Sequence, residues 1–139
     1  MTGFLLDTSA ISEFAKREPN LGFLTWAREV DPARIHLSAI TIGELWYGIA
    51  LSHEAQRARL ETWLSHEVLP EFGLRILAFD ASVSARCGAL RASARRAGRT
   101  LSALDAAIAA TAMQFDLTLI SRIEREFSHA GVPTFNPWS

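Results

Sequence analysis

Three carboxylates in this chain stand in unusually apolar or small-residue surroundings, which makes them the first candidates for chemistry. Asp7 ends an apolar run, Glu44 lies inside an apolar stretch, and Asp105 is followed by alanines. A fourth acid, Glu126, comes directly before Phe127. Two carboxylates about 4 Å apart repel by roughly 4 kcal/mol at an effective dielectric near 20. A converging set of these acids therefore requires protons or a cation, and Mg²⁺ or Mn²⁺ suits oxygen ligands of this kind.

Helix capping is the alternative role for each acid taken singly. Asp7 has the residue type and position of an N-cap. Glu44 and Asp105 each stand three residues after a Thr or Ser, which is the spacing of a capping box. Glu126 taken alone is a surface helix residue. We favour convergence because all four acids stand beside helix N-termini or strand ends, which an α/β sheet gathers at one edge.

Short apolar strands alternate with helical patterns along the chain. The predicted strands are Gly3–Leu6, Ile35–Ser38, Arg75–Phe79, Leu117–Ile120 and Val132–Phe135. The predicted helices lie around Ile11–Ala15 and over Leu21–Val30, Thr41–Leu51, His53–Leu69, Ala81–Ala97, Leu104–Phe115 and Ile123–Phe127. Such alternation is typical of a parallel sheet with helices on both faces. We expect an α/β fold, a three-layer α/β/α sandwich whose central sheet is mainly parallel with four or five strands.

Length and composition agree with one compact unit. The 139 residues fit a single domain, predicted to span residues 1–139. A hydrophobic fraction of 49% against 21% charged residues excludes a disordered chain. The 14 basic and 15 acidic residues nearly cancel, so the average charge does not by itself predict a nucleic-acid binder. The single cysteine, Cys87, excludes a scaffold stapled by internal disulfides.

The chain is expected to be soluble and cytoplasmic, without a membrane partner. Its N-terminus has no basic region followed by a long apolar segment, so a signal peptide is not predicted. The best membrane candidate, Ile35–Leu51, is interrupted by His36 and Glu44 and falls short of the ~20 apolar residues that a span needs. The histidines are scattered and lack the ligand spacing of a zinc site.

The order of these motifs resembles the PIN-domain ribonucleases, and among them the VapC toxins of bacterial toxin–antitoxin pairs. The segments that carry the resemblance are Leu5–Ser9, Thr41–Gly48, Leu101–Ala112, Leu117–Arg122 and Gly131–Trp138. They cover nearly the whole chain in order, so the resemblance is specific although each motif alone is weak. It implies a PIN-like fold and hydrolysis of RNA phosphodiester bonds with Mg²⁺ or Mn²⁺ as the cofactor.

The resemblance also implies roles for individual residues. It puts metal-binding acids at Asp7, Glu44 and Asp105, of which Asp7 and Asp105 are the principal expected ligands. Thr8 and Ser121 become polar neighbours that orient the acids or a water molecule. A metal ion in such a site lowers the pKa of bound water and polarises a phosphate oxygen, so no side-chain nucleophile is required.

One stretch departs from the family pattern. After the fourth strand the family usually carries an Asn and then an Asp-Phe pair, whereas this chain has Ile123 and then Glu126. Glu126 is one methylene longer than Asp, and we expect it to complete the catalytic acids directly or through water. The departure leaves an alternative open, namely a degenerate PIN fold that binds its partner or RNA without cutting it.

The expected substrate is single-stranded or loop RNA, cut to leave 5′-phosphate and 3′-hydroxyl ends. The expected partners are a second copy of the chain and a cognate antitoxin whose tail occludes the acidic pocket. A receiver-like Mg²⁺-binding signalling domain is a less favoured alternative because it requires a late-strand lysine, and the single lysine is Lys16. A haloacid-type phosphatase requires Asp-x-Asp after the first strand, but Ser9 stands where the second Asp belongs.

Five arginines occur in a stretch without any acid that leads up to Asp105. We predict that four of them contact RNA phosphates: Arg86, Arg91, Arg95 and Arg99. The last three are spaced four residues apart and share one helix face if the helix continues past Gly98. A solvated helix face is the alternative interpretation. Binding through this stripe should weaken as the salt concentration rises.

Overall fold

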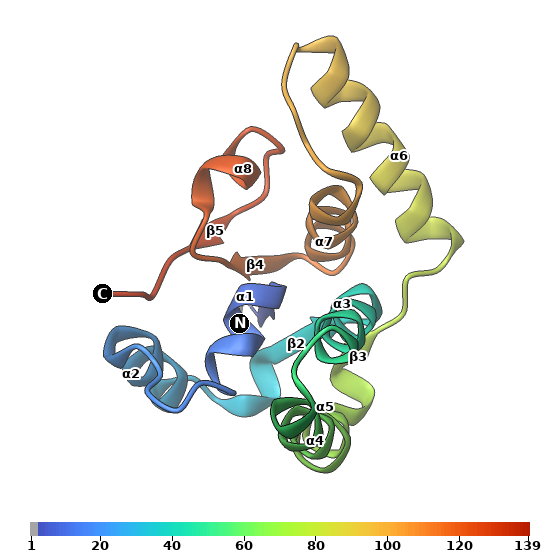
Figure 1. Ribbon diagram of the computed structural model, residues 1–139. Helices are drawn as coiled ribbons and strands as arrows, with labels where there is room; N and C mark the ends of the chain where they lie inside the picture. The colour runs from blue at the N-terminus through green and yellow to red at the C-terminus, as the bar shows by residue number, and fades with distance from the viewer. Residues whose placement is uncertain (1–2) are drawn as a thin grey trace.

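The computed structural model describes residues 3–139, without the side chains of Glu126 and Ser128, and its core is a parallel sheet (Figure 1). The strands are β1 (Gly3–Leu6), β2 (Ile35–Ser38), β3 (Ile76–Leu77), β4 (Leu117–Ile120) and β5 (Thr134–Phe135). They form a 5-stranded sheet in the order β3-β2-β1-β4-β5, and each neighbouring pair is parallel. β1 and β4 lie side by side at the centre, although more than a hundred residues separate them along the chain.

Helices cover both faces of this sheet. They are α1 (Thr8–Glu13), α2 (Leu21–Glu29), α3 (Ala39–Ala50), α4 (Glu54–Trp63), α5 (Leu69–Phe72), α6 (Ala81–Arg96), α7 (Ala103–Gln114) and α8 (Glu124–Ser128). Alternation along β1 sends Leu6 into a core with α1, α2 and the α4–α5 segment, and Leu5 into a core with α7 and α8. α6 packs mainly on α7, outside the sheet layers. The predicted three-layer α/β/α architecture is confirmed.

The predicted helix end before Pro70 is wrong. α4 runs through a π-helical segment, Leu64–Val68, into α5, which holds Pro70 in its first turn. Proline is tolerated in the first turn of a helix because the N–H that it lacks has no partner there. The helical path ends instead at Gly73, whose φ of 44° lies in the left-handed region that glycine adopts readily.

The predicted strand Arg75–Phe79 shortens to β3 for a topological reason. β3 is an edge strand, and only Ile76 and Leu77 pair with a neighbour, opposite Leu37 and Ser38 of β2. The chain then leaves the sheet to begin α6. A sequence pattern alone does not show where pairing with one neighbour stops.

The C-terminal end of α6 places Arg99 off the helix. α6 ends at Arg96, and Gly98 follows with a φ of 70°. The amide of Arg99 donates to the carbonyl of Ala94 at 2.9 Å, which together with the Gly98 amide bond to Arg95 forms a Schellman motif. The three arginines spaced four residues apart therefore do not share one helix face, because the condition that the helix continues past Gly98 is not met.

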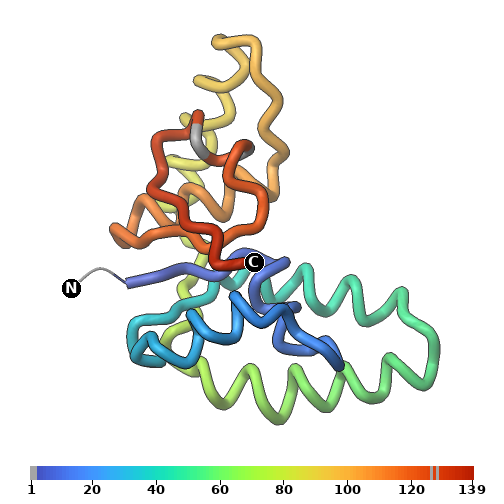
Figure 2. The backbone as a smooth tube through the Cα atoms, turned by 90° about the vertical axis from the view of Figure 1, so that its left-hand side faces the viewer, coloured from blue at the N-terminus to red at the C-terminus, as the bar shows by residue number. Residues whose placement is uncertain are grey.

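The end of the chain returns to its beginning. Figure 2 shows the C-terminus beside the segment that connects α1 and α2. There the side chain of Asn20 receives hydrogen bonds from the amide and hydroxyl of Ser139 at 3.0 and 3.3 Å. In the part of the chain that the structure describes, no helix has both the length and the apolar character needed to cross a bilayer.

Candidate active site

The centre of the sheet positions the candidate site. β1 and β4 end side by side, so Asp7 and Ser121 follow them at the same edge. The amide of Asp7 donates to the carbonyl of Ile120 at 3.1 Å, which extends the pairing of the two strands by one step. The carboxyl edge of a parallel sheet is where α/β proteins form their sites.

Asp7 caps α1 and also faces the site. Its Oδ1 accepts hydrogen bonds from the Ala10 amide at 2.8 Å and from the Ser9 hydroxyl at 2.7 Å. The two roles considered for Asp7, a helix cap and a member of an acidic cluster, are therefore compatible in geometry. Ser9 is a neighbour that the sequence analysis did not select, although a short polar residue two positions after an N-cap Asp is a usable signal.

Asp105 reaches the same place from another element. Ser102 is the N-cap of α7 and accepts from the Asp105 amide at 3.1 Å, so Asp105 lies in the first turn of α7. Burial raises the pKa of the Asp7 carboxyl, hydrogen bonds from Ser121, Ser9 and the Ala10 amide lower it, and repulsion by Asp105 raises it; the net effect is a raised pKa. The two carboxylates are thus close enough to interact, as the convergence hypothesis requires.

The capping-box interpretation of Glu44 is wrong. α3 begins earlier than predicted, and its N-cap is Ser38, whose hydroxyl accepts from the Ile40 amide at 3.1 Å. Glu44 therefore lies in the second turn, too far along the helix to reach the N-cap amide. Its Oε1 instead accepts a hydrogen bond from the Thr8 hydroxyl at 2.9 Å. Thr8 follows Asp7 directly, so this bond ties α3 to the candidate site.

Ser121 is a fully buried hydroxyl beside Asp7. Its Oγ accepts from the Ile123 amide at 3.0 Å and also hydrogen-bonds to the Asp7 carboxylate. Ile123 itself is exposed where the family pattern has an Asn. Glu126, the fourth predicted acid, lies in α8, and its side chain is outside the described residues. The structure thus brings Asp7, Asp105 and Ser121 together and links Glu44 to them through Thr8.

The donor set fits a metal ion that keeps most of its water ligands. Among the side chains that the structure describes, no three from His, Cys, Asp and Glu are placed to hold one ion together. Asp7 and Asp105 remain as an interacting carboxylate pair with the Ser121 hydroxyl beside it. Mg²⁺ is commonly bound by one or two carboxylates and retains several waters. A divalent cation would also remove the repulsion that raises the pKa of Asp7.

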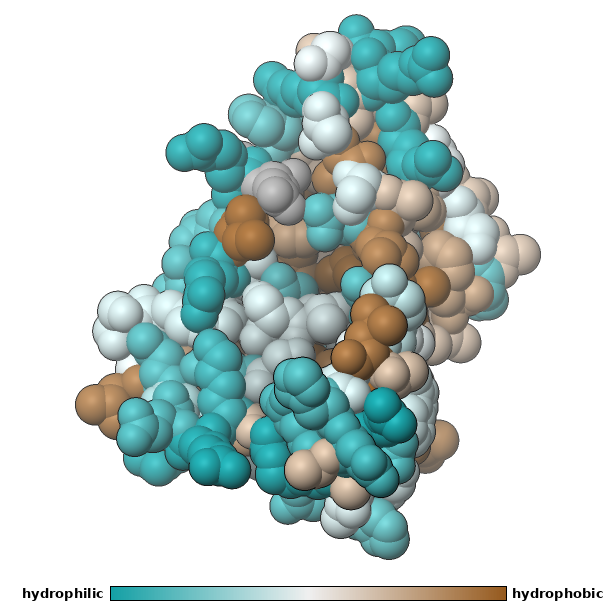
Figure 3. Space-filling model, viewed as in Figure 1, coloured by the Kyte–Doolittle hydropathy of each residue, from teal (hydrophilic) through white to brown (hydrophobic). Residues whose placement is uncertain are grey.

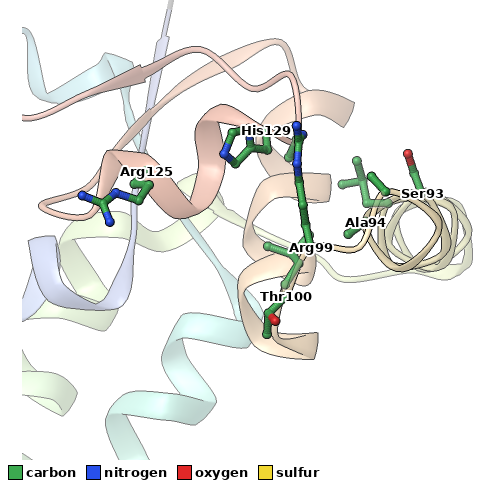
Figure 4. Close-up of a pocket in the computed structure, with 10 residues that line it drawn as sticks. Ser93, Ala94, Arg99, Thr100, Arg125 and His129 are labelled. Carbon is green, nitrogen blue, oxygen red and sulfur yellow. The ribbon is translucent and has the colours of Figure 1, made fainter.

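The predicted phosphate-contacting arginines have different surroundings. The Nε of Arg86 donates to the side-chain oxygen of Gln114 at 3.2 Å, which holds this arginine against α7. Arg91 and Arg95 are exposed on α6. Arg99 lines a cavity of about 290 Å³ between α6 and α8. In Figure 4 the side chain of Arg99 stands between the two helices, whereas Arg125 points away from α6.

The comparisons with known proteins agree with this architecture. The family model described as "PIN domain" matches residues 4–132. Toxin FitB of Neisseria gonorrhoeae is 39% identical over 135 residues, which cover 96% of this chain and 97% of that protein. VapC ribonuclease Y4jK of Sinorhizobium fredii is 36% identical over 135 residues, which cover 96% of each chain.

Solved structures give the same result. The crystal structure of FitAcB from Neisseria gonorrhoeae superposes with a TM-score of 0.91 at 39% identity, covering 97% of this chain and 98% of that one. A toxin–antitoxin complex from Klebsiella pneumoniae superposes with a TM-score of 0.68 at 28% identity, covering 99% of both chains. The chain belongs to the PIN-domain family, which confirms the resemblance seen in the order of its sequence motifs.

Proposed function

We propose that the protein is a metal-dependent endoribonuclease, the toxin of a toxin–antitoxin pair, which hydrolyses RNA phosphodiester bonds. The observation that carries this proposal is the interacting pair of Asp7 and Asp105 at the carboxyl edge of the sheet. A pair of this kind attracts a hard divalent cation, and the relatives of the chain include a protein named VapC ribonuclease.

The cation of this proposal is Mg²⁺ or Mn²⁺, held by the carboxylates of Asp7 and Asp105. When bound, it supplies positive charge that lowers the pKa of water and stabilises negative charge on the phosphate oxygens. The chain's own groups set the position of the acids. Ser121 and Ser9 hold the Asp7 carboxylate by hydrogen bonds, and the Ser102 cap fixes the first turn that carries Asp105.

Glu44 is the acid assigned to proton transfer in this proposal. The hydroxyl of Thr8 occupies its Oε1, which leaves Oε2 to accept a proton from the attacking water. Glu126 is assigned as a further acid of the same set. No side-chain nucleophile is needed because water attacks the phosphorus directly.

The remaining assignments concern partners and place. We assign single-stranded or loop RNA as the substrate, with phosphates contacted by Arg91, Arg95, Arg99 and, within its tie to Gln114, Arg86. The Klebsiella pneumoniae complex supports an antitoxin partner that covers the acidic site. A homodimer, a single domain over residues 1–139 and a cytoplasmic location complete the proposal.

The test is RNA cleavage by the purified protein with Mg²⁺, with Mn²⁺ and with a chelator. We expect cleavage with either ion, none with the chelator, and loss of at least about a thousandfold in Asp7→Asn and in Asp105→Asn. The products should carry 5′-phosphate ends, read by their sensitivity to a 5′-phosphate-dependent exonuclease.

Asp80→Asn is a matched control for Asp7→Asn. Asp80 is also an N-cap aspartate, and its Oδ1 accepts from the Val83 amide at 3.0 Å at the start of α6. We expect this variant to cut RNA at the rate of the unsubstituted protein. Metal-independent cleavage, or full activity in both site variants, would contradict the proposal. RNA binding without any cleavage would favour the degenerate binding module instead.

A further inference from the structure

A groove runs from the candidate site along the surface between α1 and α4. Thr8 and Glu44 line one end of it, and three cationic side chains line the other: Lys16, Arg17 and Arg59. Its volume is about 550 Å³. The groove therefore begins at the hydrogen-bonded Thr8–Glu44 pair and leads away from it into a region of positive charge.

The three cations are presented by two different elements. Lys16 and Arg17 follow the end of α1, whereas Arg59 lies on α4. The Nη1 of Arg59 donates to the carbonyl of Ala15 at 3.0 Å, which holds its guanidinium across the groove. The Nζ of Lys16 lies 3.0 Å from Oε1 of Glu13. An Arg side chain has five N–H donors and a Lys side chain has three, so both keep donors for a ligand after making these bonds.

The lining of the groove carries more positive than negative charge. Of its described lining residues, Glu44 is the single acid, and it stands at the end that belongs to the candidate site. Gln56 adds an amide between the charged ends. Figure 3 shows hydrophilic side chains gathered over the lower part of the molecule, where α4 lies in the view of Figure 1. A groove lined in this way attracts an extended anion and repels it only near the acids.

We propose that this groove binds the backbone of single-stranded RNA on one side of the phosphate that is cut, with Lys16, Arg17 and Arg59 contacting its phosphates. The inference rests on the proposed ribonuclease function and adds the path of the substrate to it. An acidic site repels a polyanion, so the phosphates next to the one being cut require cations at the mouth of the site.

The groove meets that need more directly than the arginines of α6. It is continuous with Glu44, whereas α6 packs on α7 and is separated from the sheet by it. The cations of the groove also come from elements that contact the site through Thr8, the first residue of α1. A strand lying in the groove is thereby delivered to the acids.

The experiment measures RNA affinity in a background that does not cut. All proteins carry Asp7→Asn, and a fluorescently labelled single-stranded oligoribonucleotide is titrated over a range of KCl concentrations. The test variant is Arg17→Ala/Arg59→Ala. The matched control is Arg28→Ala/Arg96→Ala, which removes the same charge from exposed sites on α2 and α6 outside the groove.

We expect the test variant to bind at least about fivefold more weakly than the control, because each lost phosphate contact removes about 0.7 from the slope of log affinity against log salt for a single strand. Arg17→Lys/Arg59→Lys should retain the slope because it keeps both charges. Equal losses in the test and control variants, or an unchanged slope in the test variant, would overturn the proposal.

Two further results separate this inference from neighbouring ones. If Asp7→Asn abolishes cleavage in the otherwise unsubstituted protein while the groove variant keeps its affinity and slope, the ribonuclease assignment stands and the groove proposal fails. If the unsubstituted protein cuts no RNA but its RNA binding depends on Arg17 and Arg59, the groove proposal stands and the ribonuclease assignment fails. Poly-L-glutamate is the probe for an acidic peptide: binding that depends on the two arginines, with RNA binding independent of them, overturns the RNA proposal.

Discussion

The indole Nε1 of Trp138 donates a hydrogen bond to Oε1 of Glu13 at 3.0 Å, across a separation of 125 residues. Glu13 ends α1 and is only 2% exposed. Its other oxygen accepts from the Asn20 amide at 2.9 Å, and Lys16 lies 3.0 Å from Oε1. The carboxylate therefore joins the end of α1, the start of α2 and the last residues of the chain. Its charge is buried but fully partnered.

Removing the charge of Glu13 should destabilise the fold. In Glu13→Gln the indole and amide donors face a neutral group, and the Lys16 charge loses its partner. We expect a loss of about 1–3 kcal/mol in the free energy of unfolding. Urea denaturation measures this change, with Glu29→Gln on the exposed side of α2 as the control at within about 0.5 kcal/mol. A Glu13→Gln protein as stable as that control would show that the buried carboxylate contributes nothing net.

The same carboxylate predicts the pH dependence of stability. Burial alone raises the pKa of Glu13, but hydrogen bonds from Trp138, the Asn20 amide and Lys16, together with the Lys16 charge, outweigh it and lower the pKa from 4.5 to about 2. A carboxyl with a lowered folded pKa stabilises the protein above its unfolded pKa and loses that contribution as the pH falls to the folded value.

The stability difference between the unsubstituted protein and Glu13→Gln should therefore be largest above pH 4.5 and shrink as the pH falls toward about 2. Urea midpoints of both proteins across this range measure it. Comparing the two proteins removes the titration of the other acids. A difference that stays constant over the whole range would mean that Glu13 does not titrate with a lowered pKa.

Local patterns carried most of the fold, and the contacts distant in sequence carried the rest. The apolar runs of β1 and β4 and the helical spacing of α7 suffice to predict a parallel sheet covered by helices. Nothing near Glu13 marks it as buried, because its partner Trp138 comes from the other end of the chain. Pro70 was interpreted as a helix end, but tertiary packing of the α4–α5 segment continues the helix past it.

The candidate site divides in the same way. Asp7 was found by the rule that sites form where parallel strands end, and the Ser102 cap places Asp105 at the start of α7. The environment of Glu44 was not predictable, because its partner Thr8 lies 36 residues away and α3 begins at a different cap from the expected one. A capping-box pattern identifies spacing but not the residue at which a helix begins.

Thr8→Val should reduce RNA cleavage while leaving the fold intact. Valine has nearly the same shape as threonine but cannot donate to Oε1 of Glu44, which sits 2.9 Å from the Thr8 hydroxyl. A hydrogen bond to a charged group contributes about 1.5–3 kcal/mol, so we expect a rate at least about tenfold lower under the proposed function. Single-turnover cleavage rates and urea denaturation are measured together.

Thr8→Ser is the control for that change, because it keeps the hydroxyl and should cut RNA at close to the original rate. A Thr8→Val protein that cuts within about a factor of two of the original, with an unchanged fold, would show that the bond to Glu44 has no role in catalysis. A Thr8→Val protein that loses activity only because it unfolds is identified by the urea measurement.

Two glycines of α6 should respond in opposite directions to the same substitution. Gly98 has a φ of 70° in the Schellman motif that ends the helix, whereas Gly88 lies inside the helix. A Cβ added at either position meets no atom within 4 Å, so backbone conformation decides the outcome. Gly98→Ala should destabilise the protein by about 1 kcal/mol, and Gly88→Ala should stabilise it by about 0.5–1 kcal/mol. Urea midpoints measure both changes, and a stabilising Gly98→Ala would mean that α6 continues past Gly98 and carries Arg99 on the face of Arg91 and Arg95.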